Sequence, residues 1–172
     1  DQTGLAWIPP SPNIPTLTAA IVYPGTCLIE GTNVSEGRGT TTPFEVIGAP
    51  WIDGYKLADE LRKANLPGIL FRPAGFTPTF SKYQGEVCQG VQLHVVDRDR
   101  FEPVRTALHL LKALKQLWPD KFQWRSSLDR LSGSDDVRLA LERGDTPEQI
   151  VESWSAALKE YEEVRRGYFL YD

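Results

Sequence analysis

The chain has 172 residues, of which 41% are hydrophobic and 10% aromatic, so it can bury the core of one globular domain and is not of the disordered class. Its net charge of −4 and sequence pI near 5.3 give no basic surface of the kind that binds nucleic acid or an anionic membrane. No apolar run reaches the roughly 20 residues that a membrane-spanning helix needs.

The first fifteen residues differ in composition from the rest. Four of the thirteen prolines lie between positions 9 and 15, and proline favours a stiff, extended connector. The chain also contains no methionine, so we expect it to be a processed product or part of a longer protein. On this interpretation residues 1–15 are a linker from an absent N-terminal domain, and residues 16–172 form a single C-terminal domain.

Apolar periodicity and turn residues predict the elements of the first half. In chain order these are a helix over Thr16–Tyr23 that stops at Pro24-Gly25, a short apolar run over Thr26–Ile29 bounded by turn signals, a helix capped by Asp53 and ending near Asn65, a strand over Gly68–Phe71, and a loop through Lys82.

In the second half, Val91, Leu93 and Val95 alternate with polar residues, which predicts a strand with one buried face. The elements expected after it are a helix from Pro103 to Trp118, a turn over Asp129–Gly133, a helix over Ser134–Arg143, one helix from the Thr146 capping box to about Arg166, and a short strand over Tyr168–Tyr171. Strands interleaved with helices without strict alternation predict a mixed α/β (α+β) fold with helices flanking a small mixed sheet.

The segment from Glu30 to Phe44 has the composition of a functional site. It contains two carboxylates, an arginine, an asparagine, five hydroxyls and three glycines, and it has no apolar periodicity. Glycine admits positive φ and close approach of other groups, so the segment is predicted to be a shaped polar loop. The alternative is a long surface turn held by its own hydrogen bonds.

Within this loop, Glu30 and Glu36 are candidates for acid/base catalysis at a glycosidic bond, provided that the fold brings them within roughly 5 to 9 Å. Arg38 has a guanidinium suited to bidentate capture of a carboxylate. Its alternative role is an internal salt bridge to Glu30 or Glu36 that only holds the loop. Thr32 and Asn33 supply donors and acceptors for hydroxyl or acetamido groups.

Other candidate groups lie outside the loop. Gln92 and His94 share the polar face of the predicted strand, although a hydrogen-bonded histidine without catalytic function is an equally good interpretation. Arg72, with Trp51, could form a cationic and aromatic wall, whereas His109 is expected to be a solvated surface residue.

No cofactor or metal is expected, because the chain has two histidines and two cysteines without metal-ligand spacing and no third glycine at dinucleotide-binding spacing. It also lacks a nucleophile elbow, which disfavours acyl transfer. Cys27 and Cys88 are compatible with one disulfide or with two buried thiols.

Several of these segments together resemble a known family. The residues Tyr23-Pro24-Gly25-Thr26-Cys27, Glu30-Gly31-Thr32-Asn33, Ser35-Glu36-Gly37-Arg38-Gly39-Thr40, Pro43-Phe44, Gly48-Ala49-Pro50-Trp51, Cys88-x-Gly90-Val91-Gln92-Leu93-His94, Asp97-Arg98, Asp129-Arg130-Leu131-x-Gly133 and Tyr168-x-Leu170-Tyr171 are similar to the C-terminal half of the bacterial exo-β-N-acetylmuramidases.

That resemblance implies a glycoside hydrolase that removes terminal N-acetylmuramic acid from the non-reducing end of peptidoglycan fragments. It implies a Rossmann-like N-terminal domain before this chain, with the cleft between the two domains. The lactyl carboxylate of the sugar would bind Arg38, or less favourably Arg72. If the principal acid or base lies on the other domain, this chain alone is inactive. A cell-wall substrate favours export to the periplasm or beyond over the cytoplasm.

Two other functions remain open on the sequence. The same loop would serve a non-catalytic carbohydrate-binding or domain-docking module, which binds a glycan or a partner domain without chemistry. It would also serve a structural assembly domain, in which the loop is buried in a contact between two copies.

Overall fold

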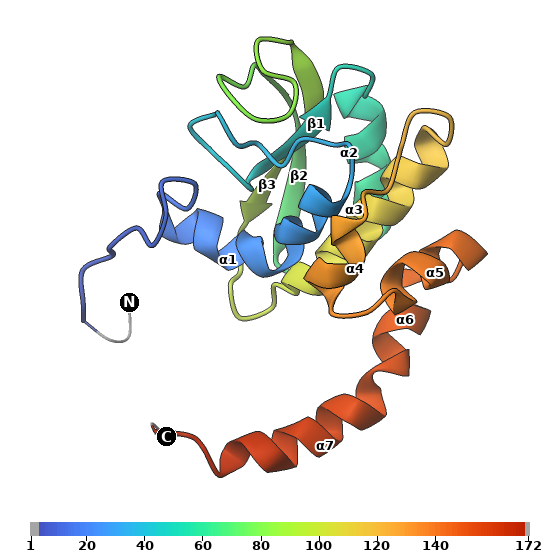
Figure 1. Cartoon of the computed structure of the whole chain (residues 1–172). Helices are drawn as coiled ribbons and strands as arrows, with labels where there is room; N and C mark the ends of the chain where they lie inside the picture. The colour runs from blue at the N-terminus through green and yellow to red at the C-terminus, as the bar shows by residue number, and fades with distance from the viewer. Residues whose placement is uncertain (1–3, 171–172) are drawn as a thin grey trace.

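A three-stranded antiparallel sheet lies at the centre of the structure, a computed structural model that describes residues 4–170 (Figure 1). Its strands are β1 (Val46–Ala49), β2 (Ile69–Phe76) and β3 (Cys88–Val95), in the order β1-β3-β2. β3 pairs with both neighbours, so that Gln92 lies between Val46 and Arg72. The predicted mixed α/β class is confirmed, and the small sheet is antiparallel in all its described strands.

One face of the sheet is buried under helices, as the alternation in β3 predicts. Val91 and Leu93 are at most 1% exposed and pack with Phe71 and Ile47 in the core. α2 (Gly54–Lys63) packs on β2 and β3, and α3 (Pro103–Leu117) packs on α1 (Leu17–Thr26) and α2. The other face carries Leu70, Arg72, Gln92 and His94, all at least partly exposed.

Both edges of the sheet carry groups that hinder pairing with another strand. β2 is an edge strand, which explains why it tolerates Pro73, a residue without a backbone N–H. Beside it, Arg62 Nη2 of α2 donates a hydrogen bond to Phe71 O at 3.0 Å. At the opposite edge, the backbones of Ser35 and Gly48 exchange two hydrogen bonds of 2.8 and 3.0 Å. The polar loop is therefore attached to β1.

β1 was not predicted from the sequence. All four of its residues are buried, because the helices cover one face and the polar loop covers the other. A strand buried on both faces has no alternation of polar and apolar residues, so it lacks the periodic signal that identified β3.

Helix starts follow the predicted capping residues. The Asp53 side chain accepts hydrogen bonds from the backbone of Tyr55 and Lys56, at the start of α2. Pro103 is the first residue of α3. The Thr146 capping box is present at the start of α6 (Pro147–Ser153), where Thr146 and Gln149 exchange hydrogen bonds.

The expected stop at Pro24-Gly25 was wrong, because α1 continues through Pro24 to Thr26. A Cβ at Gly25 would lie 1.9 Å from Pro103 O, so the glycine lets this last turn pack directly against the start of α3. Tertiary packing thus offsets the hydrogen bond that Pro24 cannot donate. The 3₁₀ helix η1 (Cys27–Gly31) follows and carries Glu30.

The C-terminal third contains more helix than expected. The predicted turn at Asp129–Gly133 lies instead in helix α4, which ends at Gly133 with φ of 86°. The predicted single helix from Thr146 to Arg166 is broken at Trp154. The predicted strand at the end is absent over residues 168–170, and Tyr171 lies outside the described residues. The helices of this C-terminal third are α4 (Ser127–Ser132), α5 (Asp136–Arg143), α6 and α7 (Ser155–Arg166).

Residues 4–15 contain no helix or strand and are mostly exposed; the linker and domain boundaries stay predictions. Within the described part of the chain, no helix is both long and apolar enough to cross a membrane.

The two cysteines are both free thiols. Cys88 is fully buried in β3, and burial together with the negative charge of Glu86 raises the pKa of its thiol to about 11. The sequence left a disulfide and two thiols open, and the structure has two thiols.

Cys88 should therefore resist alkylation in the folded protein. The thiolate is the reactive species, so at pH 8 iodoacetamide should modify Cys88 only after unfolding in guanidinium, as measured by peptide mass spectrometry. Denatured protein is the control for complete reaction. Rapid native-state labelling of Cys88 would contradict the described burial.

Candidate functional site

The polar loop is shaped by residues with positive φ. Gly37 and Gly39 have φ of 81° and 82°, and Phe44 has φ of 66°. A Cβ on Gly39 would lie 2.6 Å from Phe80 O, and Thr79 donates two hydrogen bonds to Gly39 O. The loop is thus closely packed against the segment between β2 and β3, and is not a solvated surface turn.

Four charged side chains meet in this packed region. Arg38 Nη1 lies 2.7 Å from Glu30 Oε2 and 3.0 Å from Glu36 Oε1, and Lys82 Nζ lies 3.0 Å from Glu36 Oε2. Glu36 is only 2% exposed, whereas the side chains of Glu30 and Arg38 are about one quarter exposed. Glu36 is therefore a buried carboxylate between two cations, Arg38 and Lys82. Glu30 and Arg38 both reach the surface.

Lys82 was not identified as a site residue from the sequence. Its ammonium donates to the backbone oxygens of Ile29, Glu30 and Val34 at 2.8 to 3.3 Å. Burial lowers the pKa of Lys82, and the attraction of Glu36 opposes that shift. These partners lie about fifty positions away in the sequence, and the only available signal was a lysine at the end of a loop rich in proline, glycine and threonine.

Arg38 joins the two carboxylates through one nitrogen of its guanidinium. Glu30 Oε2 and Glu36 Oε1 contact the same nitrogen, so their separation cannot exceed the sum of 2.7 and 3.0 Å. The guanidinium also lies over the Phe44 ring, 4.9 Å from its centre. Although burial opposes it, hydrogen bonding to Glu30 and Glu36 raises the pKa of Arg38. Within residues 4–170, both carboxylate contacts of Arg38 use Nη1, so Nη2 and Nε have no carboxylate contact.

Thr32 and Asn33 are engaged in the fold itself. Thr32 is fully buried, and its hydroxyl donates to Ile29 O and accepts from Val34 N. The Asn33 amide donates to Lys121 O and accepts from Gln123 N. The structure thus gives these two side chains a role in connecting η1 to the segment before α4.

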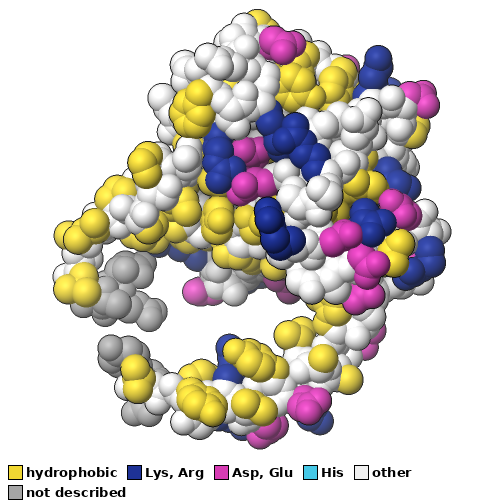
Figure 2. All heavy atoms as spheres, in the orientation of Figure 1, with side chains coloured by type: hydrophobic (Ala, Val, Ile, Leu, Met, Phe, Trp, Pro, Cys, Tyr) yellow, Lys and Arg dark blue, Asp and Glu magenta, His cyan; other side chains and the backbone are white. Residues whose placement is uncertain are grey.

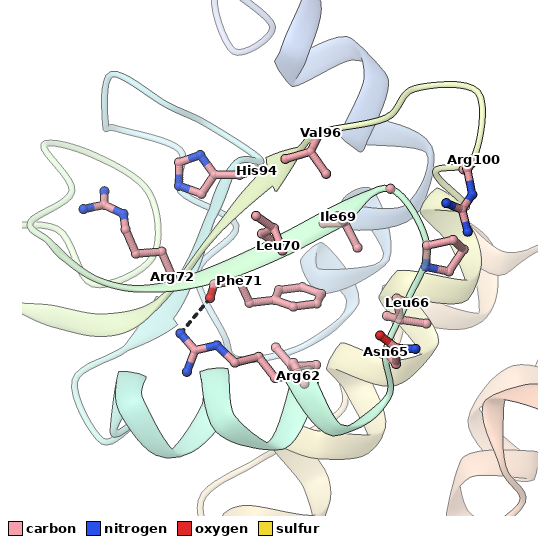
Figure 3. Close-up of a pocket in the computed structure, with 13 residues that line it drawn as sticks. Arg62, Asn65, Leu66, Ile69, Leu70, Phe71, Arg72, His94, Val96 and Arg100 are labelled. Carbon is pink, nitrogen blue, oxygen red and sulfur yellow. Dashed lines mark hydrogen bonds between the residues drawn. The ribbon is translucent and has the colours of Figure 1, made fainter.

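Arg72, Gln92 and His94 lie together on the outer face of the sheet. Arg72 Nη2 donates to Gln92 Oε1 at 2.6 Å, and His94 is exposed on the same face. Arg72 and His94 line a hollow of about 730 Å³ at the free edge of β2 (Figure 3). None of Glu30, Glu36, Arg38 or Lys82 lines this hollow, so the candidate residues form two groups.

Trp51 belongs to neither group. It donates to the Tyr83 hydroxyl at 3.2 Å and packs edge-on against Trp118. Tyr83 in turn donates to Asn33 O. The prediction for His109 was wrong, because its side chain is only 13% exposed and its ring lies 3.0 Å from Glu148. Burial lowers the pKa of His109, and Glu148 opposes that shift.

Among residues 4–170, no group of three or more metal-ligating side chains is close enough to hold a metal ion. Figure 2 shows acidic and basic side chains gathered near the middle of the face it presents.

The chain belongs to the family described as "Exo-beta-N-acetylmuramidase NamZ, C-terminal", whose model matches residues 21–171. This confirms the family that the motifs resemble. The similar proteins include the peptidoglycan beta-N-acetylmuramidase NamZ of Bacillus subtilis (strain 168), which is 49% identical over 99% of this chain and 42% of its own length. The chain thus spans less than half of that curated relative.

Two solved structures of DUF1343 family proteins from Bacteroides fragilis NCTC 9343 have the same fold. One superposes with a TM-score of 0.90 at 31% identity, covering 99% of this chain and 47% of its own. The other has a TM-score of 0.73 at 31% identity, covering 96% and 44% of the respective chains.

Lys82→Met should destabilise the domain strongly, because it leaves Glu36 charged and buried with one cation fewer. Breaking a buried pair from one side costs about 3–5 kcal/mol, which urea unfolding would measure. Lys63→Met is the matched control, since Lys63 pairs with Glu60 but is exposed and should change stability by less than about 1 kcal/mol. Equal effects of the two substitutions would contradict the structural role of Lys82.

Proposed function

We propose that this domain is the C-terminal part of an exo-β-N-acetylmuramidase and supplies one wall of the pocket for the terminal sugar. Family membership and 49% identity to a peptidoglycan beta-N-acetylmuramidase support the class of reaction, which is hydrolysis of a glycosidic bond in peptidoglycan. The observation that favours the polar loop as the wall is the partly exposed Arg38, held in place by two carboxylates.

Arg38 is suited to bind the lactyl carboxylate of N-acetylmuramic acid. An acidic protein needs a local cation to bind an anionic sugar, and the guanidinium fork matches a carboxylate. The ion contacts to Glu30 and Glu36 and the ring of Phe44 fix its position before substrate arrives, so less side-chain entropy is lost on binding. Gln92, His94 and Arg72 on the outer sheet face would extend this wall along the glycan.

Glu30 and Glu36 then have different roles. Glu36 is buried between Arg38 and Lys82, so it is a positioning residue for Arg38. Glu30 is the carboxylate that reaches the surface, and it remains the candidate for acid/base work. The two carboxylates are close together, since both contact Arg38 Nη1, but a guanidinium lies between them, unlike the pair of carboxyl groups that flanks the glycosidic bond in a glycosidase.

The principal acid or base would then lie on a preceding domain, and this chain alone would bind substrate without turnover. A peptidoglycan substrate also favours a protein exported from a bacterial cell. The competing function is a carbohydrate-binding module without any catalytic partner. Hydrolysis of a chromogenic muramic acid glycoside by the full-length protein, but not by this chain, would support the first function, and binding without hydrolysis by both would support the second.

Arg38→Ala in the full-length protein should lower kcat/KM for muramic acid substrates by about 10- to 100-fold, because hydrogen bonds to charged groups contribute about 1.5–3 kcal/mol. Glucosamine analogues, which lack the lactyl carboxylate, should lose much less. Arg72→Ala is the control and should have a smaller effect, since Arg72 lies in the second group of residues. Equal losses on both classes of substrate would exclude Arg38 as the carboxylate ligand.

Glu36→Gln and Glu30→Gln should have different kinetic effects in the full-length protein. Glu36→Gln should raise KM for muramic acid substrates about tenfold and leave kcat within a few-fold, because on this proposal Glu36 positions Arg38 and takes no part in the reaction itself. Glu30→Gln should lower kcat by about 100-fold and remove one limb of the pH–rate profile. An unchanged pH profile with kcat near that of the parent would exclude Glu30 as an acid or base.

A further inference from the structure

The last helix has an apolar strip that the described chain does not cover. Leu158, Tyr161 and Val164 of α7 are 56%, 62% and 56% exposed, and no residue of α7 is buried. Their spacing of three residues places them on one side of the helix, and we call these three residues the apolar strip. Side chains of this size seldom lie together in water without a partner.

The opposite side of α7 is built for solvent. Glu163 and Arg166 form an ion pair on that side, and Glu162 at its margin pairs with Arg165 and Arg166; the 3.6-residue turn places Arg165 itself beside Leu158 and Tyr161. Such pairs add only a few tenths of a kcal/mol each, and α7 has 12 residues, a length at which an isolated helix is marginal in water. The helix therefore needs packing on its apolar strip to be stable.

The position of α7 points to the side on which the partner lies. Trp154, at the junction of α6 and α7, packs against the core and fixes the base of the helix. From there α7 leaves the rest of the molecule, and the two ends of the described chain lie on the same side (Figure 1). Figure 2 shows hydrophobic side chains along the side of this helix that faces the rest of the molecule across open space.

The N-terminal segment contributes to the same region. Ile8 is 80% exposed and Trp7 is 42% exposed, and the Trp7 indole donates to Pro15 O, which holds the segment against the start of α1. Exposed apolar side chains thus come from both ends of the described chain.

Relatives carry additional chain that could fill this space. The Bacillus subtilis relative is matched over 42% of its length, by a family model that is itself described as C-terminal. A Bacteroides fragilis structure superposes on 99% of this chain with a TM-score of 0.90 and has more than half of its residues outside the match. The placement of α7 in this chain is therefore compatible with the presence of a preceding domain.

We propose that the apolar strip of α7, with the apolar side chains of the N-terminal segment, is the docking surface for the N-terminal half of the full-length protein. In this arrangement α7 contacts the preceding domain on one side and the segment before α1 contacts it on another. We call these two contacts together the clasp. The proposal rests on the proposed function in one respect, since both require an N-terminal half of the full-length protein. It makes α7 responsible for the placement of the two domains, and so for the geometry of the pocket between them.

Hydrogen exchange of α7 tests this clasp. In the full-length protein the amides of residues 155–166 should exchange at least about tenfold more slowly than in the 172-residue chain, because packing raises the free energy of local opening. Tyr161→Glu should abolish that difference. Ala156→Glu is the matched control, since it adds the same charge on the opposite side of α7, and it should preserve the protection.

Two results would overturn the proposal. One is equal exchange of α7 in the two forms. The other is protection in the 172-residue chain that rises with protein concentration and accompanies a dimer mass in light scattering, which would make a second copy the partner of the apolar strip. Activity separates this proposal from the proposed function: protected α7 in a full-length protein without muramidase activity would uphold the clasp alone, and activity with unprotected α7 would uphold the function alone.

Discussion

The carboxylate of Glu36 is the constraint on which the functional loop depends. A charge that is 2% exposed is tolerated only when opposite charges or hydrogen bonds surround it, so Arg38 and Lys82 are required where they are. Lys82 in turn binds three backbone oxygens of the 29–34 region. One buried charge therefore fixes the shape of the loop, its attachment to the segment between β2 and β3, and the direction of Arg38.

The same network connects the sheet to the surface. The polar loop is joined to β1 through Ser35 and Gly48, and β1 pairs with β3, whose outer face carries Gln92 and His94. Candidate ligand-binding residues thus lie on a loop and on strands that share one backbone hydrogen-bond network. Groups held on a rigid scaffold keep their geometry when substrate binds, which is the property that a recognition wall needs.

Local chemistry made part of this structure predictable. Asp53, Pro103 and Thr146 mark helix starts because capping depends on residues adjacent in sequence. The composition of the Glu30–Phe44 segment likewise indicated a shaped loop, and Arg38 was expected to bind either a ligand or its own neighbouring carboxylates. β1, Lys82 and the continuation of α1 through Pro24 were not predictable, since each depends on packing between distant parts of the chain. The break between α6 and α7 falls at Trp154, which packs against the core.

The protected edges of the central sheet have a consequence for how the molecule associates. Pro73 and Arg62 block one edge, and the hydrogen bonds of Ser35 block the other, so another polypeptide cannot readily add a strand to either side. Cross-strand polymerisation is thereby disfavoured even when the domain is produced in isolation. The exposed apolar side chains of α7, and not the sheet edges, are then the surface through which isolated copies would associate.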